Sequence, residues 1–298
     1  MRKLPLYLVL RGGLGNQLFM ISTGMQVALL NRRSLRVIPN WYATQSWGDA
    51  PLNVVRSYEL NRLSSKVFAR SKIDQVIQSA LFLLFKITWK YGEKATLGFS
   101  INTDLIKDKK IHRRTMLIYG SIMINSENLI AIRSEIIELL TMGKFDEENI
   151  RREIQGHREE GLRLLAIHVR RGDRVSPYSR EGVLSLEYYR NQLTEFDPSN
   201  YRFLVFSDDI DWCRKNFTTY NYVFIDESSP LRSLKLMSNC DDFLISLSTF
   251  SWWAAWLSTS IDKKVVMPIV NDNDKYRNWN NLFQPGWEKS EARFEKLN

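Results

Sequence analysis

Short apolar runs alternate with amphipathic stretches along most of the chain. Residues 6–10 (LYLVL) are continuously apolar, which is typical of a strand covered on both faces. Residues 18–30 follow with the apolar spacing of a helix, and residues 34–39 can form the next strand. This order predicts a βαβ unit at the start of the chain.

The middle of the chain has a mostly helical pattern. Residues 57–95 favour helix, residues 115–120 a strand, and residues 126–140 an amphipathic helix. The apolar side of that last helix is expected to carry Leu129, Ile132, Ile136, Ile137 and Leu140. Residues 141–161 are polar and charged and contain a further helix. We expect a domain boundary near residues 145–155.

From residue 163 onward, predicted strands and helices alternate regularly. The strands are 163–169, 202–207, 222–226, 241–248 and 263–269. The helices are 186–196, 210–217, 230–240 and 251–258. Such alternation predicts a parallel sheet covered by helices. We therefore expect an α/β protein of two domains, 1–150 and 151–298, that face a cleft.

Composition narrows the class of protein. The chain has 298 residues, of which 44% are hydrophobic and 25% charged, as in ordinary globular proteins. Its formal net charge of +9 indicates an anionic partner, such as nucleic acid, a phosphorylated metabolite or an acidic membrane surface. Because no RNA-binding motif occurs and the aromatic residues do not interleave with basic ones, we expect no nucleic-acid partner.

The cysteines and the apolar segments indicate in which cellular compartment the protein is expected to reside. Cys213 and Cys240 show no metal-binding spacing, which favours a reduced, intracellular protein without a zinc site. The first apolar run ends at Arg11 without a cleavage site and is interpreted as a strand rather than a signal peptide. Residues 80–89 are too short and too interrupted to span a bilayer. They indicate either a core helix or a membrane-surface contact.

Residues 168–173 (HVRRGD) place two arginines at the end of a predicted buried strand. Ligands of open parallel sheets bind beyond the carboxyl ends of the strands, and an arginine there offers a fork of donors to a phosphate. Neighbouring side chains on an extended backbone point opposite ways. We expect one arginine to face a ligand and the other to be held by a carboxylate such as Asp173. A surface ion pair that only ends the strand is the alternative.

Residues 12–17 (GGLGNQ) form a glycine-rich turn between a strand and a helix. Such a turn can bring backbone N–H groups and the helix N-terminus close to an anion. It matches neither GxGxxG, because Leu18 occupies the third glycine position, nor a P-loop. The amides of Asn16 and Gln17 can bind a sugar or a phosphate. A plain tight turn is the alternative.

Polar residues also follow two further predicted strands. In FSDD (206–209), the carboxylates can accept hydrogen bonds from a base or a ribose, or else Ser207, Asp208 or Asp209 caps the next helix. In STFSWW (248–253), hydroxyl groups at a helix N-terminus form a second possible anion site. Trp252 and Trp253 are interpreted as core or domain-interface residues.

A metal-dependent alternative rests on residues 272–274 (DND). Asp272 and Asp274 have the DxD spacing that can chelate a divalent cation beside a nucleotide diphosphate. They lie late in the chain, in an asparagine-rich loop, so we rank this alternative below a metal-free site.

Together, the motifs GGLGNQLF, HVRRGD, FSDDIDWC and MSNCDDFLISLSTFSWWAAWL resemble the bacterial α-1,2-fucosyltransferase family, glycosyltransferase family 11. The resemblance runs from about Val9 to about Pro268. The family pattern is close to NSTFSWWGAWL, where this chain has Leu247 in place of asparagine and Ala254 in place of glycine. The loop after residue 173 also diverges.

The resemblance implies a GT-B-like fold of two Rossmann-like domains. Domain 1–150 would serve mainly the acceptor, and domain 151–298 would bind a GDP-sugar, with its last helix packing back on the first domain. The implied reaction is inverting transfer of L-fucose from GDP-L-fucose to the 2-hydroxyl of a galactoside, without cofactor or metal.

The resemblance implies bacterial O-antigen synthesis in the cytoplasm as the biological setting. The acceptor would be a galactose-terminated glycan. Whether this glycan is lipid-linked, and whether the protein docks on the inner membrane, are left open by the resemblance. GDP-colitose is an alternative donor. Acceptor choice is expected to reside in residues 40–60 and 95–115.

The resemblance also implies roles for single residues. Arg170 would hold the β-phosphate, His168 and Asp209 would face the guanosine, and Asn16 would lie near the reacting centre. Asp173 is a candidate general base, although pairing with Arg171 is an equally good role for it. The candidate catalytic residues are Arg170, Asp173 and Asn16. The donor-binding candidates are Gly13, Gly15, Asn16, Gln17, His168, Arg170, Arg171, Ser207, Asp208, Asp209, Ser248, Thr249, Phe250 and Ser251.

Overall fold

The chain divides into two compact units, Met1–Met142 and Gly143–Asn298. The computed structural model describes residues 5–10, 12–38, 60, 72–91, 100–102, 111–113, 115–119, 129–158, 161–175, 182–270 and 277–295. The predicted boundary at residue 150 is too late, because helix α4 (Lys144–His157) belongs as a whole to the second unit. Ile150 and Ile154 of α4 are buried, and Glu147 forms an ion pair with Lys235 of helix α7 (Pro230–Ser238) at 2.8 Å.

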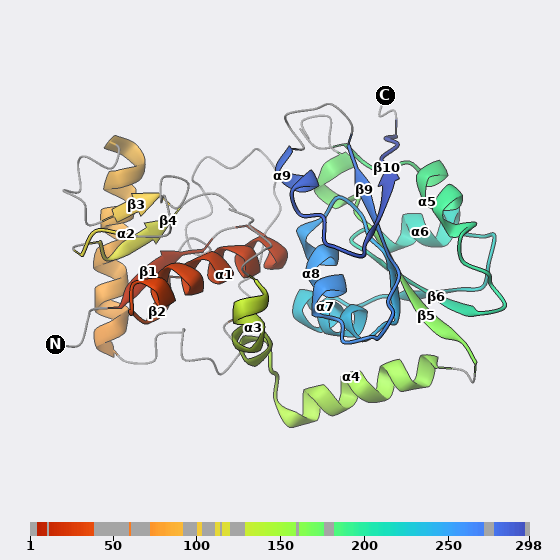
Figure 1. The fold of residues 1–298 in the computed structure, drawn as a ribbon, viewed down its shortest axis with the longest axis horizontal. Helices are drawn as coiled ribbons and strands as arrows, with labels where there is room; N and C mark the ends of the chain where they lie inside the picture. Colours follow the sequence, from red (N-terminus) through yellow and green to blue (C-terminus); the bar gives the residue numbers. More distant parts are fainter. Residues whose placement is uncertain are drawn as a thin grey trace. The chain divides into compact units, whose positions relative to one another are not determined.

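The first unit holds a four-stranded parallel sheet of order β2-β1-β4-β3 (Figure 1). Its strands are β1 (Leu6–Val9), β2 (Leu35–Ile38), β3 (Ser100–Asn102) and β4 (Leu117–Tyr119). Helix α1 (Leu14–Leu30) connects β1 to β2, which confirms the predicted βαβ unit. All four residues of β1 are buried, as expected for a central strand.

Helix α2 (Lys72–Tyr91) packs on this sheet through one face. Leu81, Phe82 and Phe85 are buried in a cluster with side chains of β1, β2 and β4. The core-helix interpretation of residues 80–89 is therefore confirmed for this face. Leu83 and Ile87 are exposed. No helix in the described part of the chain is long and apolar enough to cross a membrane.

Within the described residues 129–140, the predicted helix 126–140 is not one continuous α-helix. A 3-10 turn, η7 (Ile130–Ile132), precedes helix α3 (Arg133–Leu139). Ile136 is buried, but Ile137 is 42% exposed and was wrongly assigned to the apolar side. Successive helical residues lie about 100° apart around the axis. Ile137 therefore points away from the surface that Ile136 covers.

The second unit holds a six-stranded parallel sheet of order β10-β9-β8-β5-β6-β7. Its strands are β5 (Arg163–Val169), β6 (Tyr201–Ser207), β7 (Tyr222–Ile225), β8 (Asp242–Leu244), β9 (Val265–Ile269) and β10 (Glu288–Glu291). The helices after α4 are α5 (Leu186–Leu193), α6 (Ile210–Asn216), α7 (Pro230–Ser238), α8 (Thr249–Leu257) and α9 (Arg277–Asn280). A 3-10 turn, η8 (Gly172–Val175), follows β5.

The position of β5 explains where this unit can bind a ligand. The strand lies between β8 and β6, so the chain leaves β5 toward one side of the sheet and later returns to its other side. Such a switch in strand order opens a crevice at the carboxyl ends of the strands. The motif at residues 168–173 begins in β5 and continues beyond its end.

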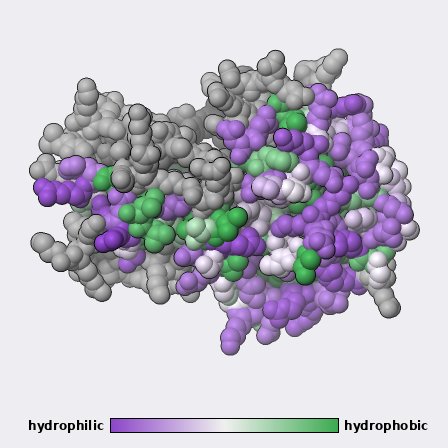
Figure 2. Space-filling model, in the orientation of Figure 1, coloured by the Kyte–Doolittle hydropathy of each residue, from purple (hydrophilic) through white to green (hydrophobic). Residues whose placement is uncertain are grey.

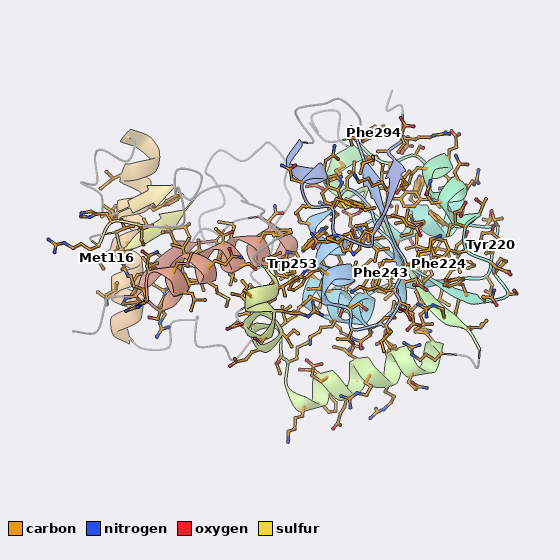
Figure 3. All side chains as sticks on the ribbon, in the orientation of Figure 1. Met116, Tyr220, Phe224, Phe243, Trp253 and Phe294 are labelled. Carbon is orange, nitrogen blue, oxygen red and sulfur yellow. The ribbon has the colours of Figure 1, made fainter. Side chains whose placement is uncertain are left out.

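Tryptophan side chains fill the interior beside α8. Trp252 and Trp253 are fully buried, with ring centroids 5.3 Å apart, and Trp252 Nε1 donates a hydrogen bond to the Leu282 carbonyl. Trp253, which lies on α8, is labelled in Figure 3. The core interpretation of both tryptophans is confirmed. By contrast, the face of this unit turned to the viewer in Figure 2 is mostly hydrophilic.

Candidate functional site

Three predicted motifs meet at one edge of the second sheet. The register pairs Val169 of β5 with Ser207 of β6, and Ile167 of β5 with Leu244 of β8. The residues that follow these three strands therefore lie at the same edge, as predicted for a parallel sheet. This edge carries HVRRGD, FSDD and STFSWW.

Arg170 is the first residue after β5, and two carboxylates hold its guanidinium. It forms ion pairs with Asp173 and with Asp208, and its side chain is 25% exposed. Asp208 also accepts a hydrogen bond from the backbone N–H of Arg171 at 2.8 Å. Residues after β5 and after β6 thus fix one partly exposed cation at the sheet edge.

Arg171 points elsewhere and is almost buried. Its Nε donates to Asp209 at 3.2 Å, its terminal nitrogen donates to Glu295 at 2.5 Å, and its guanidinium lies 3.8 Å from the centroid of the Trp212 ring. The prediction that the two arginines diverge is confirmed. The predicted pairing of Arg171 with Asp173 is wrong, because the turn η8 brings Asp173 back toward Arg170.

His168 is a neutral group beneath these arginines. Its side chain is buried, its Nδ1 lies 2.7 Å from Ser246 Oγ, and its ring lies 5.5 Å from that of Phe250. Burial lowers the pKa of His168 to about 3, and the nearby positive charges of Arg170 and Arg174 act in the same direction. A neutral imidazole can donate one hydrogen bond and accept another.

Asp208 and Asp209, which follow β6, have different structural roles. The Asp209 carboxylate caps α6 by accepting the Trp212 N–H at 3.3 Å, while Ser207 Oγ accepts the N–H of Asp209 at 2.9 Å. The capping interpretation is therefore confirmed for Asp209. Asp208 instead contacts the two arginines. Guanosine binding by Asp209 stays a prediction.

The N-terminus of α8 opens at the same edge. Ser248 caps the helix by accepting the Phe250 N–H at 3.3 Å, and Thr249 begins it two residues earlier than predicted. Ser251 is fully buried and its hydroxyl donates to the Ser248 carbonyl at 3.2 Å. Ser248 is buried as well, whereas Thr249 is half-buried, so Thr249 is the most accessible of these three residues.

The glycine-rich motif of the first unit is part of a helix start. Helix α1 begins at Leu14, so Gly15, Asn16 and Gln17 lie in its first turn rather than before it. Gly12 has a φ of +77°, and a Cβ there would lie 2.9 Å from Asn16 Nδ2. A side chain at position 12 would therefore be strained and crowded.

Gln17 stabilises this helix start from inside. Its side chain is fully buried, and its Nε2 donates to the Gly12 carbonyl at 3.0 Å. Among the described residues, no group donates a hydrogen bond to its buried Oε1. Gly13 stands at the N-cap of α1 with an extended backbone and makes no side-chain capping hydrogen bond.

Several predictions fall outside the described residues. Asp272 and Asp274 are among them, as are most residues of the expected acceptor segments 40–60 and 95–115. Within the described part of the chain, no group of three His, Cys, Asp or Glu side chains could hold a metal ion. The DxD alternative therefore stays untested.

Sequence reasoning missed four residues of the site. Ser246, Trp212 and Glu295 contact His168 or Arg171, and Arg174 donates to the Leu247 carbonyl at 2.5 Å. Ser246 and Trp212 lie beside recognised motifs and could have been included. Glu295 is 124 residues from Arg171 and carries no local signal.

Comparison with known proteins identifies the class. The model of glycosyl transferase family 11 matches residues 114–291, which is more than half of the chain. The chain therefore belongs to glycosyl transferase family 11 and is a glycosyltransferase. This confirms the family expected from the motifs.

Individual relatives differ in how much of them the chain covers. It is 26% identical to the O-antigen biosynthesis glycosyltransferase WbnK of Escherichia coli over 287 residues, covering 88% of this chain and 93% of WbnK. It is 37% identical to an alpha-1,2-colitosyltransferase of Escherichia coli over 103 residues, covering 31% of this chain and 36% of the relative. Identity to the Bos taurus galactoside 2-alpha-L-fucosyltransferase SEC1 is 32% over 140 residues, covering 43% and 38%.

Among solved structures, the GDP complex of a FUT1 variant from Arabidopsis thaliana resembles this chain. The TM-score is 0.53 at 12% sequence identity, covering 92% of this chain and 72% of that one. At this identity the likeness concerns the fold alone. The expected α/β fold of the GT-B type, with a parallel sheet in each unit, is confirmed.

Proposed function

We propose that this glycosyltransferase transfers L-fucose from GDP-L-fucose to the 2-hydroxyl of a galactoside, with inversion and without a metal ion. The observation that carries the proposal is the fixed guanidinium of Arg170 at the carboxyl edge of the sheet. The family supports it, as do relatives named as α-1,2-fucosyl and colitosyl transferases.

The proposed chemistry depends on the charge of the leaving group. Departure of GDP develops negative charge on its diphosphate, and a pre-organised cation lowers the free energy of that transition state. Arg170 would supply the cation, oriented beforehand by Asp173 and Asp208. The N-terminus of α8, with Thr249 as its first residue, would add backbone N–H groups to the same anion.

Asp173 fits positioning better than proton abstraction. Its carboxylate is already engaged by the Arg170 guanidinium, and its side chain is only 11% exposed. A general base must be within hydrogen-bond reach of the acceptor hydroxyl. We therefore assign Asp173 to the orientation of Arg170.

For the other candidates we propose contacts with the nucleotide and the acceptor. His168, as a neutral hydrogen-bonding group, and Asp209 would contact the guanosine. The second unit would bind the donor and the first unit the acceptor, with Asn16 near the reacting centre. The side chains of Gln17 and Ser251 are fully buried. These two residues would therefore contribute indirectly, by stabilising the first turns of α1 and α8.

GDP-colitose is the second candidate donor. The observation that favours it is the 37% identity to an alpha-1,2-colitosyltransferase, against 26% identity to WbnK and 32% to SEC1. A donor sugar that lacks one hydroxyl needs one hydrogen bond fewer from the protein. The same Arg170 chemistry would serve either donor.

The proposed biological setting is bacterial surface-polysaccharide synthesis. The similarity to WbnK, which is named for O-antigen biosynthesis, supports this setting along most of the chain. The acceptor would then be a galactose-terminated, lipid-linked glycan. The net charge of +9 and the exposed Leu83 and Ile87 of α2 would favour contact with an anionic inner-membrane surface.

A donor and acceptor assay tests the proposal. Purified protein is incubated with EDTA, with GDP-L-fucose or GDP-colitose, and with a panel of β-galactosides, and GDP release and product linkage are measured. An α-1,2-linked fucosyl product supports the proposal, and transfer from GDP-colitose alone favours the second donor. Activity that appears only after adding Mn²⁺ or Mg²⁺ contradicts metal independence and would favour Asp272 and Asp274.

A further inference from the structure

The segment that carries Glu295 is fixed against the second unit. Ser185 donates its N–H to the Arg293 carbonyl at 2.7 Å, and Glu295 donates its N–H to the Val183 carbonyl at 2.8 Å. Between these bonds, Leu184 and Phe294 form an antiparallel bridge. The backbone of residues 293–295 therefore has a defined position.

The side chain of Phe294 packs on the second unit and so holds residues 293–295 in position. Its ring packs against the main apolar cluster of the unit and is labelled in Figure 3. A Cβ built on Gly182 would lie 2.4 Å from the Phe294 ring, so only glycine leaves room for it there. Residue 295 is thus held in register, and its side chain can act on the neighbouring motif.

Within the described part of the chain, the Glu295 carboxylate pairs with the buried guanidinium of Arg171. The side chain of Arg171 is 8% exposed, and Asp209 and Glu295 accept its hydrogen bonds. The Trp212 ring covers its face. Removing one partner from a buried charge is costly, because the charge must find another acceptor or reach water. Asp208 belongs to the same network, because its carboxylate accepts a hydrogen bond from the Arg171 backbone N–H at 2.8 Å.

We propose that Glu295 is a positioning residue of the GDP-sugar site. By holding the Arg171 side chain, it keeps Asp208 available to orient Arg170. The inference rests on the proposed function and deepens it. Glu295 lies beyond residue 291, where the match to the family model ends.

Two other roles make different predictions. If Glu295 only stabilised the fold, its loss would lower the melting temperature and leave the GDP affinity of the folded protein unchanged. If its negative charge only opposed the diphosphate, Glu295→Ala and Glu295→Gln would both bind GDP more tightly than the wild type. A positioning role predicts weaker binding that glutamine partly restores, because its amide oxygen can still accept from Arg171.

The experiment measures GDP binding by calorimetry for the wild type, Glu295→Ala and Glu295→Gln. We expect Glu295→Ala to bind about tenfold more weakly and Glu295→Gln to lie between it and the wild type, as mispositioned site groups commonly cost this much or more. The matched control is Glu187→Gln, which removes the neighbouring exposed pair with Arg293 and is expected to bind normally. Wild-type affinity in Glu295→Ala overturns the inference.

A second measurement separates this inference from the proposed function. Hydrogen exchange of the 168–175 segment is compared without ligand, because the Arg171 N–H donates to Asp208 in the ligand-free chain. We expect faster exchange there in Glu295→Ala and no change in Glu187→Gln. Failure of the wild type to bind GDP contradicts the proposed function. Unchanged exchange in folded Glu295→Ala contradicts the positioning role by itself.

Discussion

Gly172 and Asp208 lie so close together that no side chain fits between them. A Cβ built on Gly172 would come within 2.2 Å of Asp208 Oδ2 and within 2.8 Å of its Cγ. The glycine in HVRRGD therefore makes room for the carboxylate that holds Arg170. The two motifs HVRRGD and FSDD are coupled through this contact.

Replacing Gly172 by alanine is expected to displace the Asp208 carboxylate and so to misplace Arg170. We expect transfer by Gly172→Ala to fall by about tenfold or more, since small displacements in a site have effects of this size. The measurement is kcat/KM for the donor, with the melting temperature recorded to verify folding.

Gly156→Ala serves as the control for this substitution. Gly156 lies in α4, and an added Cβ would meet nothing within 4 Å. Alanine in a helix is favoured over glycine by about 1 kcal/mol, so this variant should be slightly more stable and fully active. Equal activity of the two alanine variants would show that Asp208 tolerates movement.

Arg170→Ala is expected to abolish most transfer while the protein stays folded. The variant loses the cation and leaves the Asp173 and Asp208 carboxylates facing the donor. Removal of one charge-stabilising donor typically lowers kcat by about 10²–10³. Steady-state kinetics test this, and Arg214→Ala, which removes an exposed arginine paired with Asp226, is the control. Near-normal turnover by folded Arg170→Ala would contradict the proposed role.

His168 should make the stability of the protein depend on pH. Its pKa is about 3 in the folded chain and near 6.5 in an unfolded one, so the unfolded state binds one more proton between these values. Its contribution is complete above pH 6.5 and is lost as the pH falls toward 3. Between pH 7 and 5 the free energy of unfolding should drop by about 2 kcal/mol through this group.

The variant His168→Asn isolates this effect, because it lacks the titrating group. Urea unfolding at pH 7 and pH 5 should show a smaller decrease for the variant than for the wild type. Asp241, whose pKa burial would raise, is instead held below its ordinary value of 3.8 by Arg158 and the Leu164 N–H. It titrates below this pH window. The same decrease in both proteins would show that His168 is not the group responsible.

The buried carboxylate of Asp242 is expected to stabilise the fold rather than serve the site. It accepts from Arg163 at 2.6 Å and from the Lys264 N–H at 2.6 Å, at the end of the strands opposite to Arg170. We expect Asp242→Ala to lower the free energy of unfolding by about 2–4 kcal/mol. GDP affinity of the folded variant should be unchanged.

The exposed ion pair of Arg214 gives the comparison for Asp242. Its side chain is 43% exposed, and its carboxylate partners are more exposed still. Arg214→Ala should therefore cost less than about 1 kcal/mol in denaturant unfolding. Similar decreases in the free energy of unfolding for Asp242→Ala and Arg214→Ala would mean that burial does not determine how much these ion pairs stabilise the fold.

The strands of the second unit were predictable because burial on both faces leaves continuous apolar runs, as in β5 and β6. Strand β10 was missed because its sequence EKSE is polar and only Ser290 is buried. The end of β8 was placed too late, since residues 245–248 stay buried after they leave the sheet. Apolar periodicity reports burial, and burial alone does not distinguish a strand from the buried chain that follows it.

The site was predictable where its residues share a short motif. The opposite directions of Arg170 and Arg171 follow from backbone geometry, but the choice of carboxylate for each depends on the turn η8 and on tertiary neighbours. Glu295 could not be assigned, because nothing in its sequence neighbourhood indicates contact with residue 171. An ion pair between residues far apart in the chain produces no periodic pattern in the sequence from which it could be predicted.

The span between Arg171 and Glu295 also has a consequence for biosynthesis. The ribosome adds Glu295 124 residues after Arg171, which takes roughly 6 to 25 s at ordinary elongation rates. During that time Arg171 is part of a nascent chain that does not yet contain Glu295. The sheet edge can thus assemble early, while its final arrangement follows only when the segment that carries Glu295 has left the exit tunnel.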